Sequence, residues 1–354
     1  MLFYYLVLFI VSFFSYRELH NTKGNKVFFL IIVFFLYLLS FLRWETGTDW
    51  DSYINIYKSV DWDNMWIVEP MFGSINVISR QLFDNYTFNL WILSSILFYY
   101  QSKSILRFSP YPLISIFMLV GMQFGNVFFV RQNIAVALTM FSVYYIINKK
   151  FVPYIIFVLM AIGFHYSAIA FIPAWWVFNM DINKRRWLLF IFLSLFCSFA
   201  FASILTFLGD VLGGGILYRL NFYLEEDVDA NPNMSVAAII IKAILNKGVF
   251  FLIGYYLYNL NFKGNKYLKQ FFNLYCFGII LFFLTVPISI HFSRSAWYYD
   301  INQIYLLPYL FAFVEKRKKY QLFLLLFVFL FLKLYLYIFS YEDLFVPYKM
   351  VNIL

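Results

Sequence analysis

Charged and hydroxyl-bearing residues first gather between residues 43 and 53, which read Arg-Trp-Glu-Thr-Gly-Thr-Asp-Trp-Asp-Ser-Tyr. A short helix that starts near Thr48, with Thr48 as its N-cap, would present the carboxylates of Asp49 and Asp51 beside the phenol of Tyr53. A carboxylate in this setting is a candidate base for removing the proton of a hydroxyl group. Because tryptophan side chains favour the headgroup layer of a bilayer, the tryptophans of this region predict that the stretch lies along a membrane surface. They are Trp44, Trp50, Trp62 and Trp66.

Two arginines stand at the ends of apolar runs. Arg131 is followed by Gln132, and Arg294 has His291 and Tyr298 as close neighbours in the sequence. The planar guanidinium fork suits phosphate or carboxylate, and an arginine at the end of a membrane span is costly unless it is paired or faces water. Each is therefore a candidate anion-binding residue, and the alternative is a headgroup contact or a structural ion pair.

Other polar residues interrupt apolar runs. His165 is a candidate acid or base, or else a structural residue at a helix turn. Lys242 and Lys247 lie within an apolar run, where they would line a cavity or extend to an interface. Asp49-Trp50-Asp51 and Asp61-Trp62-Asp63 match an Asp-x-Asp pattern that holds a divalent metal in some sugar transferases. The carboxylates of acidic pairs in a water-exposed loop are mostly solvated, so we expect neither a metal nor another cofactor.

The composition indicates the scaffold that must hold these residues. The chain of 354 residues is 63% hydrophobic and 25% aromatic, with only 13% charged residues. Apolar runs near the length that spans a bilayer recur throughout. They predict an all-α integral membrane protein, a single polytopic domain over 1–354 with about 10–13 transmembrane helices and one re-entrant or interfacial segment. The expected spans are 1–16, 26–42, 87–102, 111–129, 131–148, 187–208, 236–258, 271–291, 297–314 and 320–340.

The basic residues indicate orientation and not nucleic-acid binding, because the net charge of +9 is spread in short clusters between the spans. All clusters fall on the cytoplasmic face if 70–84 lies in the interface and 151–180 forms a helical hairpin that turns near Gly163 and His165. In the alternative arrangement, 70–84 crosses the membrane and 151–180 is a single long tilted span. The first arrangement places two long loops outside, 43–69 and 209–235, and with them Arg43, Arg131, Arg219 and Arg294.

Five separated pieces of the chain together resemble one family. They are Arg43-x-x-x-Gly47-Thr48-Asp49-Trp50-x-x-Tyr53, then Glu69-Pro70-Met71-Phe72 with Asn76, then Asn126 through Arg131-Gln132-x-x-Ala135, then Ala161-x-x-Phe164-His165-x-Ser167-Ala168, and Ser293-Arg294 before Tyr298 and Leu307-Pro308. In order and approximate spacing they are similar to the EpsG family of Wzy-type polysaccharide polymerases.

The resemblance implies a GT-C-like architecture and an enzyme of the bacterial inner membrane. This enzyme would join oligosaccharide repeat units carried on undecaprenyl pyrophosphate at the periplasmic face. Its product would be O-antigen, capsule or exopolysaccharide, and a separate co-polymerase would set chain length. With this resemblance, Arg131, Arg294 and Arg43 are expected to bind pyrophosphate, Asp49 or His165 to act as base, and Glu69, Tyr53 and the tryptophans to position sugars. Further candidate substrate-binding residues are Gln132, Arg219, Lys242, His291 and Tyr298.

Three other functions fit a multispan protein with outward arginines. A transferase that uses a polyprenyl-phosphate sugar predicts a metal held by an Asp-x-Asp pair. A flippase for lipid-linked oligosaccharide would bind the same cargo without chemistry, although such transporters usually contain internal repeats, and none is evident here. An acyltransferase that modifies glycans would need a donor path from the cytoplasm to an outward histidine.

Overall fold

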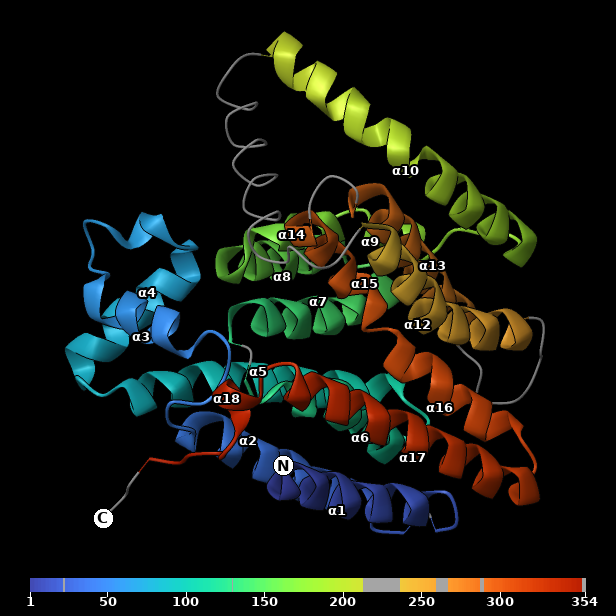
Figure 1. The fold of residues 1–354 in the computed structure, drawn as a ribbon, viewed down its shortest axis with the longest axis horizontal. Coiled ribbons are helices and arrows are strands. Elements are labelled where there is room, and N and C mark those ends of the chain that lie inside the picture. The colour runs from blue at the N-terminus through green and yellow to red at the C-terminus, as the bar shows by residue number, and fades with distance from the viewer. Residues whose placement is uncertain (22, 129, 213–235, 259–266, 287–289, 352–354) are drawn as a thin grey trace. The chain divides into compact units, whose positions relative to one another are not determined.

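The computed structural model describes the chain outside residues 22, 129, 213–235, 259–266, 287–289 and 352–354 (Figure 1). Side chains are described outside these ranges and outside 199–212, 236–237 and 290–291. The described residues form helices and no β-strand, with one isolated bridge between Arg43 and Met350. The all-α class predicted from composition is therefore confirmed.

Four helices in the described residues are long and apolar enough to cross a membrane. They are α2 (Asn25–Leu42), the part of α12 over Ala238–Leu257, α13 (Leu268–Thr285) and α17 (Lys316–Phe339). The total number of crossings, between 10 and 13, stays a prediction, as does the GT-C-like architecture.

The helices form two compact units, and each is described separately here. Unit 1 contains residues Met1–Ala168 and Leu307–Leu354, and unit 2 contains residues Ile169–Leu306. The single polytopic domain and its two outer loops stay predictions.

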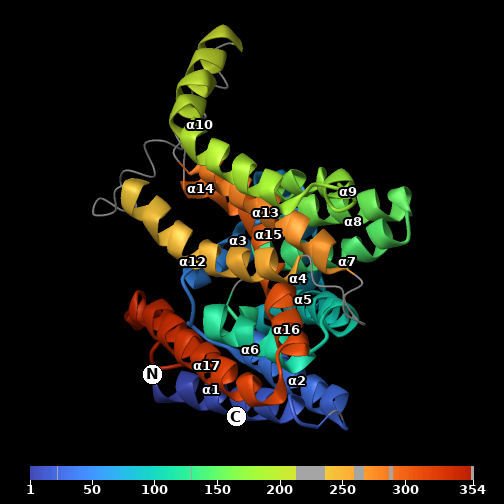
Figure 2. The same ribbon diagram turned by 90° about the vertical axis from the view of Figure 1, so that its right-hand side faces the viewer.

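Unit 1 is a bundle in which α1, α2, α6 and α17 pack together (Figure 2), while α5 packs on α2 and α7, and α7 packs on α8. Its remaining helices are short, and α4 contacts α3, α5 and α8. The helices not yet bounded are α1 (Leu2–Glu18), α3 (Trp50–Ser59), η1 (Met65–Ile67), α4 (Pro70–Leu82), α5 (Tyr86–Phe108), α6 (Pro112–Gln123), η2 (Phe124–Asn126), α7 (Arg131–Ile147), α8 (Phe151–Phe164) and α18 (Glu342–Phe345).

Basic helix ends of unit 1 meet in two pairs. The rings of His20 and Tyr320 stack at 4.7 Å, which brings the end of α1 to the start of α17. The Arg107 guanidinium lies 3.7 Å from the Tyr144 ring, which joins the ends of α5 and α7. The candidate residues of unit 1 lie at the opposite helix ends. This grouping is the one expected if the basic clusters face the cytoplasm.

The expected span over 111–129 is wrong as a continuous helix, because α6 ends at Gln123. Phe124, Gly125 and Asn126 all adopt left-handed backbone conformations, which stop an α-helix. The Asn126 side chain donates to Gln101 at 2.6 Å and accepts from Asn133 at 3.0 Å, so the break is held by α5 and α7. The break lets the chain turn and begin α7 at Arg131.

Unit 2 is organised around α13, which contacts each of the described helices that carry a candidate residue, namely α12, α14, η4 and α15. The expected span over 297–314 is wrong as one helix, because a turn at Ile301 and Asn302 separates α15 from α16. The N–H of Asn302 donates to Tyr299, three residues back, in place of the α-helical partner four residues back. The elements of this region are η3 (Tyr166–Phe171, which starts in unit 1), α9 (Ala174–Val177), α10 (Lys184–Leu212), α12 (Val236–Leu257), α14 (Ile290–Ser293), η4 (Arg294–Ala296), α15 (Trp297–Asp300) and α16 (Gln303–Phe313, which ends in unit 1).

The two segments on which the predicted orientation depends are both partly helical. The segment 70–84 forms α4, which at about 20 Å is shorter than the roughly 30 Å hydrocarbon layer, as an interfacial or re-entrant helix would be. The segment 151–180 begins with α8 and leaves α-helical geometry at His165, near the predicted turn. The second half of the predicted hairpin is not one regular helix, because it contains only the short elements η3 and α9.

Candidate active site

Arg131 is the centre of the candidate site in unit 1. It is the first residue of α7, and its Nη1 donates to Glu69 Oε2 at 2.9 Å. A cation at a helix N-terminus is unfavourable, so the carboxylate of Glu69 compensates the charge. The Arg131 side chain is 26% exposed, against 8% for Glu69. The Arg131 Nε atom is buried and has no hydrogen-bond partner among the described residues, so a donor is left for another group.

The first turns of three helices converge on this guanidinium. The Arg131 Cζ atom lies 5.2 Å from the centre of the Tyr53 ring and 5.5 Å from the Phe72 ring. Tyr53 belongs to the first turn of α3 and Phe72 to the first turn of α4. Each helix N-terminus carries partial positive charge, which the carboxylates of Asp49 and Glu69 at the starts of α3 and α4 partly offset. The cluster therefore offers an anion one guanidinium beside the first turns of three helices.

Asp49 and Tyr53 contribute an acceptor and a donor to the same cluster. The structure makes Asp49 the N-cap of α3, so the prediction that Thr48 caps this helix is wrong. The Tyr53 hydroxyl lies 3.4 Å from Asp49 Oδ2. Burial, followed by the Asp49 charge, raises the pKa of Tyr53 against the opposite effect of Arg131. The phenol therefore stays protonated at neutral pH and can donate a hydrogen bond.

Arg43 lies beside Trp50, at the start of α3, and is only 1% exposed. Its Nη1 donates to the carbonyl oxygen of Phe128 at 2.6 Å and points to that of Thr46 at 3.4 Å. Its guanidinium also faces the Trp50 ring at 5.7 Å. Burial lowers the pKa of Arg43, although a guanidinium stays charged in proteins. These contacts favour a positioning role for Arg43 over the direct pyrophosphate contact expected from the sequence.

His165 lies at the end of α8, and α8 packs on α4. Gly163 leaves room for Met71 of α4, because a Cβ atom there would come within 2.6 Å of Met71 Cγ. Met71 is two residues from Glu69, so His165 belongs to the end of unit 1 that carries the cluster. The His165 Nδ1 atom is 2.6 Å from Ser167 Oγ. Gln132 is half-buried beside Arg131 in α7.

The candidate residues of unit 2 differ in exposure. Arg294 in η4 and Lys242 in α12 are exposed, whereas Tyr298 in α15 is buried. Arg219 lies outside the described residues, and so does the side chain of His291. Within the described part of the chain, no three His, Cys, Asp or Glu side chains lie close enough together to hold a metal ion.

The C-terminal segment is part of the site region, and sequence reasoning missed it. Residues Tyr341–Val351, called the C-terminal segment below, pack on the loop Arg43–Gly47. The backbone N–H of Trp44 donates to Lys349, at 3.0 Å, and that of Gly47 to Leu344, also at 3.0 Å. The Lys349 ammonium pairs with Glu45 at 2.9 Å. No local sequence pattern indicates these contacts, because the residues that make them are about 300 positions apart.

An ion pair inside unit 2 was missed as well. Lys247, in the middle of α12, pairs with the buried carboxylate of Asp300. Tyr275 donates to the carbonyl oxygen of Lys247 at 2.9 Å. Asp300 Oδ1 is buried without a partner among the described residues. The sequence signal was a lysine near mid-span, which requires a carboxylate or water nearby.

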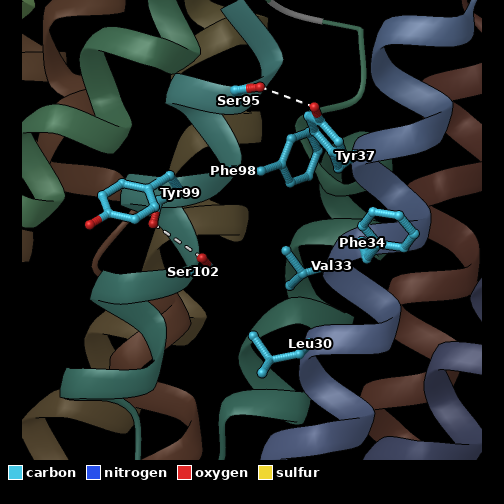
Figure 3. Close-up of a pocket in the computed structure, with 8 residues that line it drawn as sticks. All are labelled: Leu30, Val33, Phe34, Tyr37, Ser95, Phe98, Tyr99 and Ser102. Atoms are coloured by element: carbon cyan, nitrogen blue, oxygen red, sulfur yellow. Dashed lines mark hydrogen bonds between the residues drawn. The ribbon is translucent and has the colours of Figure 1, made fainter. Parts of the chain in front are cut away.

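A groove of about 440 Å³ lies between α2 and α5 (Figure 3). Leu30, Val33 and Phe34 face it from α2, and Phe98 from α5, while Tyr37 and Ser95 share a hydrogen bond of 3.0 Å across it. No residue of the Arg131 cluster lines this groove.

The sequence model of the EpsG family matches residues 26–350, which is nearly the whole chain. No curated protein and no solved structure matches the chain.

Proposed function

We propose that this chain, which belongs to the EpsG family, a family that includes Wzy-type polysaccharide polymerases, joins oligosaccharide repeat units carried on undecaprenyl pyrophosphate. The reaction takes place at the periplasmic face of the bacterial inner membrane, and its product is O-antigen, capsule or exopolysaccharide. A co-polymerase that regulates chain length is a proposed partner.

The observation that carries this proposal is the convergence of three helix N-termini on Arg131. The leaving group of the reaction is a lipid pyrophosphate, which gains negative charge as its bond to the sugar breaks. Backbone N–H groups and a guanidinium fixed in advance stabilise such charge more than mobile water does. The buried Nε of Arg131 has no acceptor among the described residues, so the site has an unused donor.

In the proposed reaction, a hydroxyl oxygen of the acceptor repeat unit attacks the anomeric carbon of the donor glycan. The new glycosidic bond forms as the bond between this carbon and the pyrophosphate oxygen breaks. The acceptor proton passes to a base, and the pyrophosphate leaves with the bonding electron pair. Asp49 is our preferred base, because it belongs to the Arg131 cluster, and His165 is the second candidate.

The other residues support this step. Glu69 fixes the Arg131 guanidinium, and the Tyr53 hydroxyl donates a hydrogen bond to the substrate or to Asp49. Arg43 holds the loop that precedes α3. Arg294, in unit 2, is proposed to bind pyrophosphate only on the basis of the motif Ser293-Arg294 that resembles the family.

The test is the length of the surface glycan, measured on a gel ladder, in a strain that lacks this chain and is complemented with variants. We expect wild type to restore long chains and Arg131→Ala to leave single repeat units. Arg131→Lys should restore little, because an ammonium cannot make two parallel bonds to an anion. An unchanged ladder with Arg131→Ala would contradict the proposal.

The same gel separates the competing functions. A flippase or an earlier transferase would cause the loss of all surface glycan, including single units, when it is deleted. Single units that remain on the surface of the deleted strain therefore support a polymerase and exclude those two functions.

A further inference from the structure

We propose that the turn formed by residues 60–67, called the tryptophan turn below, is a sugar-binding subsite in which Trp62 and Trp66 stack on rings of the oligosaccharide substrate. This inference rests on the proposed function and adds to it the place where the glycan is held.

The structure divides the four tryptophans of the 43–69 loop into two kinds. Trp50 is buried, and its ring packs on Trp44 at 5.4 Å and on Tyr86 at 5.2 Å. Trp62 and Trp66 are 46% and 66% exposed. Trp44 and Trp50 therefore stabilise the loop, whereas the rings of Trp62 and Trp66 are accessible to a ligand.

The tryptophan turn is held in a fixed conformation. The Asn64 side chain accepts from the Asp61 backbone N–H at 2.7 Å, and Asp61 accepts in return from the Asn64 N–H at 3.0 Å. The turn also lies close to α4, because a Cβ atom at Gly73 would come within 2.7 Å of the Met65 carbonyl oxygen. Exposed aromatic rings on a fixed backbone lose little conformational entropy when a ligand binds.

The tryptophan turn leads along the chain into the Arg131 cluster. Trp66 precedes Glu69 by three residues, and of the two residues between them Ile67 is exposed and Val68 is buried. Glu69 makes the ion pair with Arg131. The segment that carries the two rings therefore leads directly into the cluster that is proposed to bind the pyrophosphate.

The charges beside the rings favour a sugar over the membrane surface as the ligand. Asp61 and Asp63 flank Trp62, and both are exposed. Carboxylates accept hydrogen bonds from sugar hydroxyls, whereas they are repelled by anionic lipid headgroups. Aromatic faces stack on the C–H groups of a pyranose ring, so the two kinds of side chain together match a carbohydrate.

Substitutions at Trp66 distinguish sugar stacking from membrane anchoring. Trp66→Phe keeps an aromatic face, whereas Trp66→Leu keeps an apolar side chain without one. We expect Trp66→Phe to support nearly wild-type chain length, and Trp66→Leu and Trp66→Ala to shorten the chains several-fold. Trp176→Ala, which removes a tryptophan of similar exposure (55%) in unit 2, is the matched control. Wild-type chains with Trp66→Leu would overturn the inference in favour of an anchor.

A binding measurement separates this inference from the proposed function. Repeat-unit oligosaccharide released from its lipid by mild acid is added to the purified full chain, and binding is followed by saturation-transfer NMR. We expect Arg131→Ala to retain the signal from the sugar and Trp66→Ala to lose most of it. Undiminished binding with Trp66→Ala overturns the subsite even if Arg131→Ala abolishes the ladder. A ladder unaffected by Arg131→Ala rejects the polymerase proposal independently.

Discussion

The guanidinium of Arg131 and the carboxylate of Glu69 form an ion pair of 2.9 Å at the meeting point of the first residue of α7 and the N-cap of α4. The pair gives Arg131 a fixed direction while leaving part of its side chain exposed. Two roles are compatible with this geometry: a structural bridge, or an anion-binding arginine held by its partner.

Exchanging the two charges separates these roles. Glu69→Arg combined with Arg131→Glu keeps an ion pair but moves the cation to α4. If Arg131 binds pyrophosphate, the exchange should restore the thermal stability lost in Arg131→Glu alone, yet leave the glycan at single repeat units. The measurements are melting in detergent and the gel ladder. Long chains from the exchanged protein would show that only the bridge matters.

Asp49→Asn tests the base while sparing the helix cap. Asparagine is as good an N-cap as aspartate, so α3 should remain stable. Without a carboxylate to accept the proton, we expect the polymerisation rate to fall by about 100-fold or more. His165→Gln should lower the rate by no more than several-fold. The rate is measured with lipid-linked repeat units and membranes. A larger loss of rate with His165→Gln than with Asp49→Asn would make His165 the base.

Arg43→Met should act mainly by lowering the stability of the protein, because Arg43 has a positioning role. The change removes charged hydrogen bonds to the carbonyl oxygens of Phe128 and Thr46 and leaves those acceptors without their donor. We expect a loss of about 2 kcal/mol in stability, visible as a lower melting temperature in detergent. Because the loop would lose its anchor, trypsin should cleave at Lys58 faster than in wild type. Unchanged melting and cleavage would rule out the positioning role.

The C-terminal segment should be required for an ordered site. Ending the chain at Ser340 removes the partners of Trp44 and Gly47, so we expect faster trypsin cleavage within 43–69 and loss of long glycan chains. Lys349→Ala is the control, because the exposed pair with Glu45 contributes about 0.5 kcal/mol or less. Full chain length from the shortened protein would show that the loop is ordered without this segment.

The pair of Lys247 and Asp300 should behave as a buried ion pair. Asp300→Leu alone leaves an uncompensated ammonium, and we expect it to cost about 3 kcal/mol. The double variant Lys247→Met, Asp300→Leu should recover most of that loss, because neither charge remains. Thermal melting in detergent measures both. Equal losses in the single and double variants would show that the two residues do not depend on each other.

Local patterns in the sequence determined the membrane class and most helices. Helices such as α2, α7 and α17 follow from apolar runs, because the cost of exposing backbone groups to lipid makes each run a helix whatever its neighbours are. The same patterns failed at 111–129 and 297–314. In the first, left-handed residues fixed by contacts with other helices interrupt the run. In the second, a turn at Ile301 and Asn302 interrupts the α-helical hydrogen-bond pattern.

The sequence by itself determined which residues are chemically unusual, because a charge beside or within an apolar run is costly wherever it occurs. It identified Arg131, Glu69 and Lys247 in this way or by motif. Only the tertiary structure decided the partners: Glu69 for Arg131, Asp300 for Lys247, and the C-terminal segment for the loop at Arg43. Those pairings join residues 53 to about 300 positions apart, and such contacts depend on how the helices pack, which local periodicity does not encode.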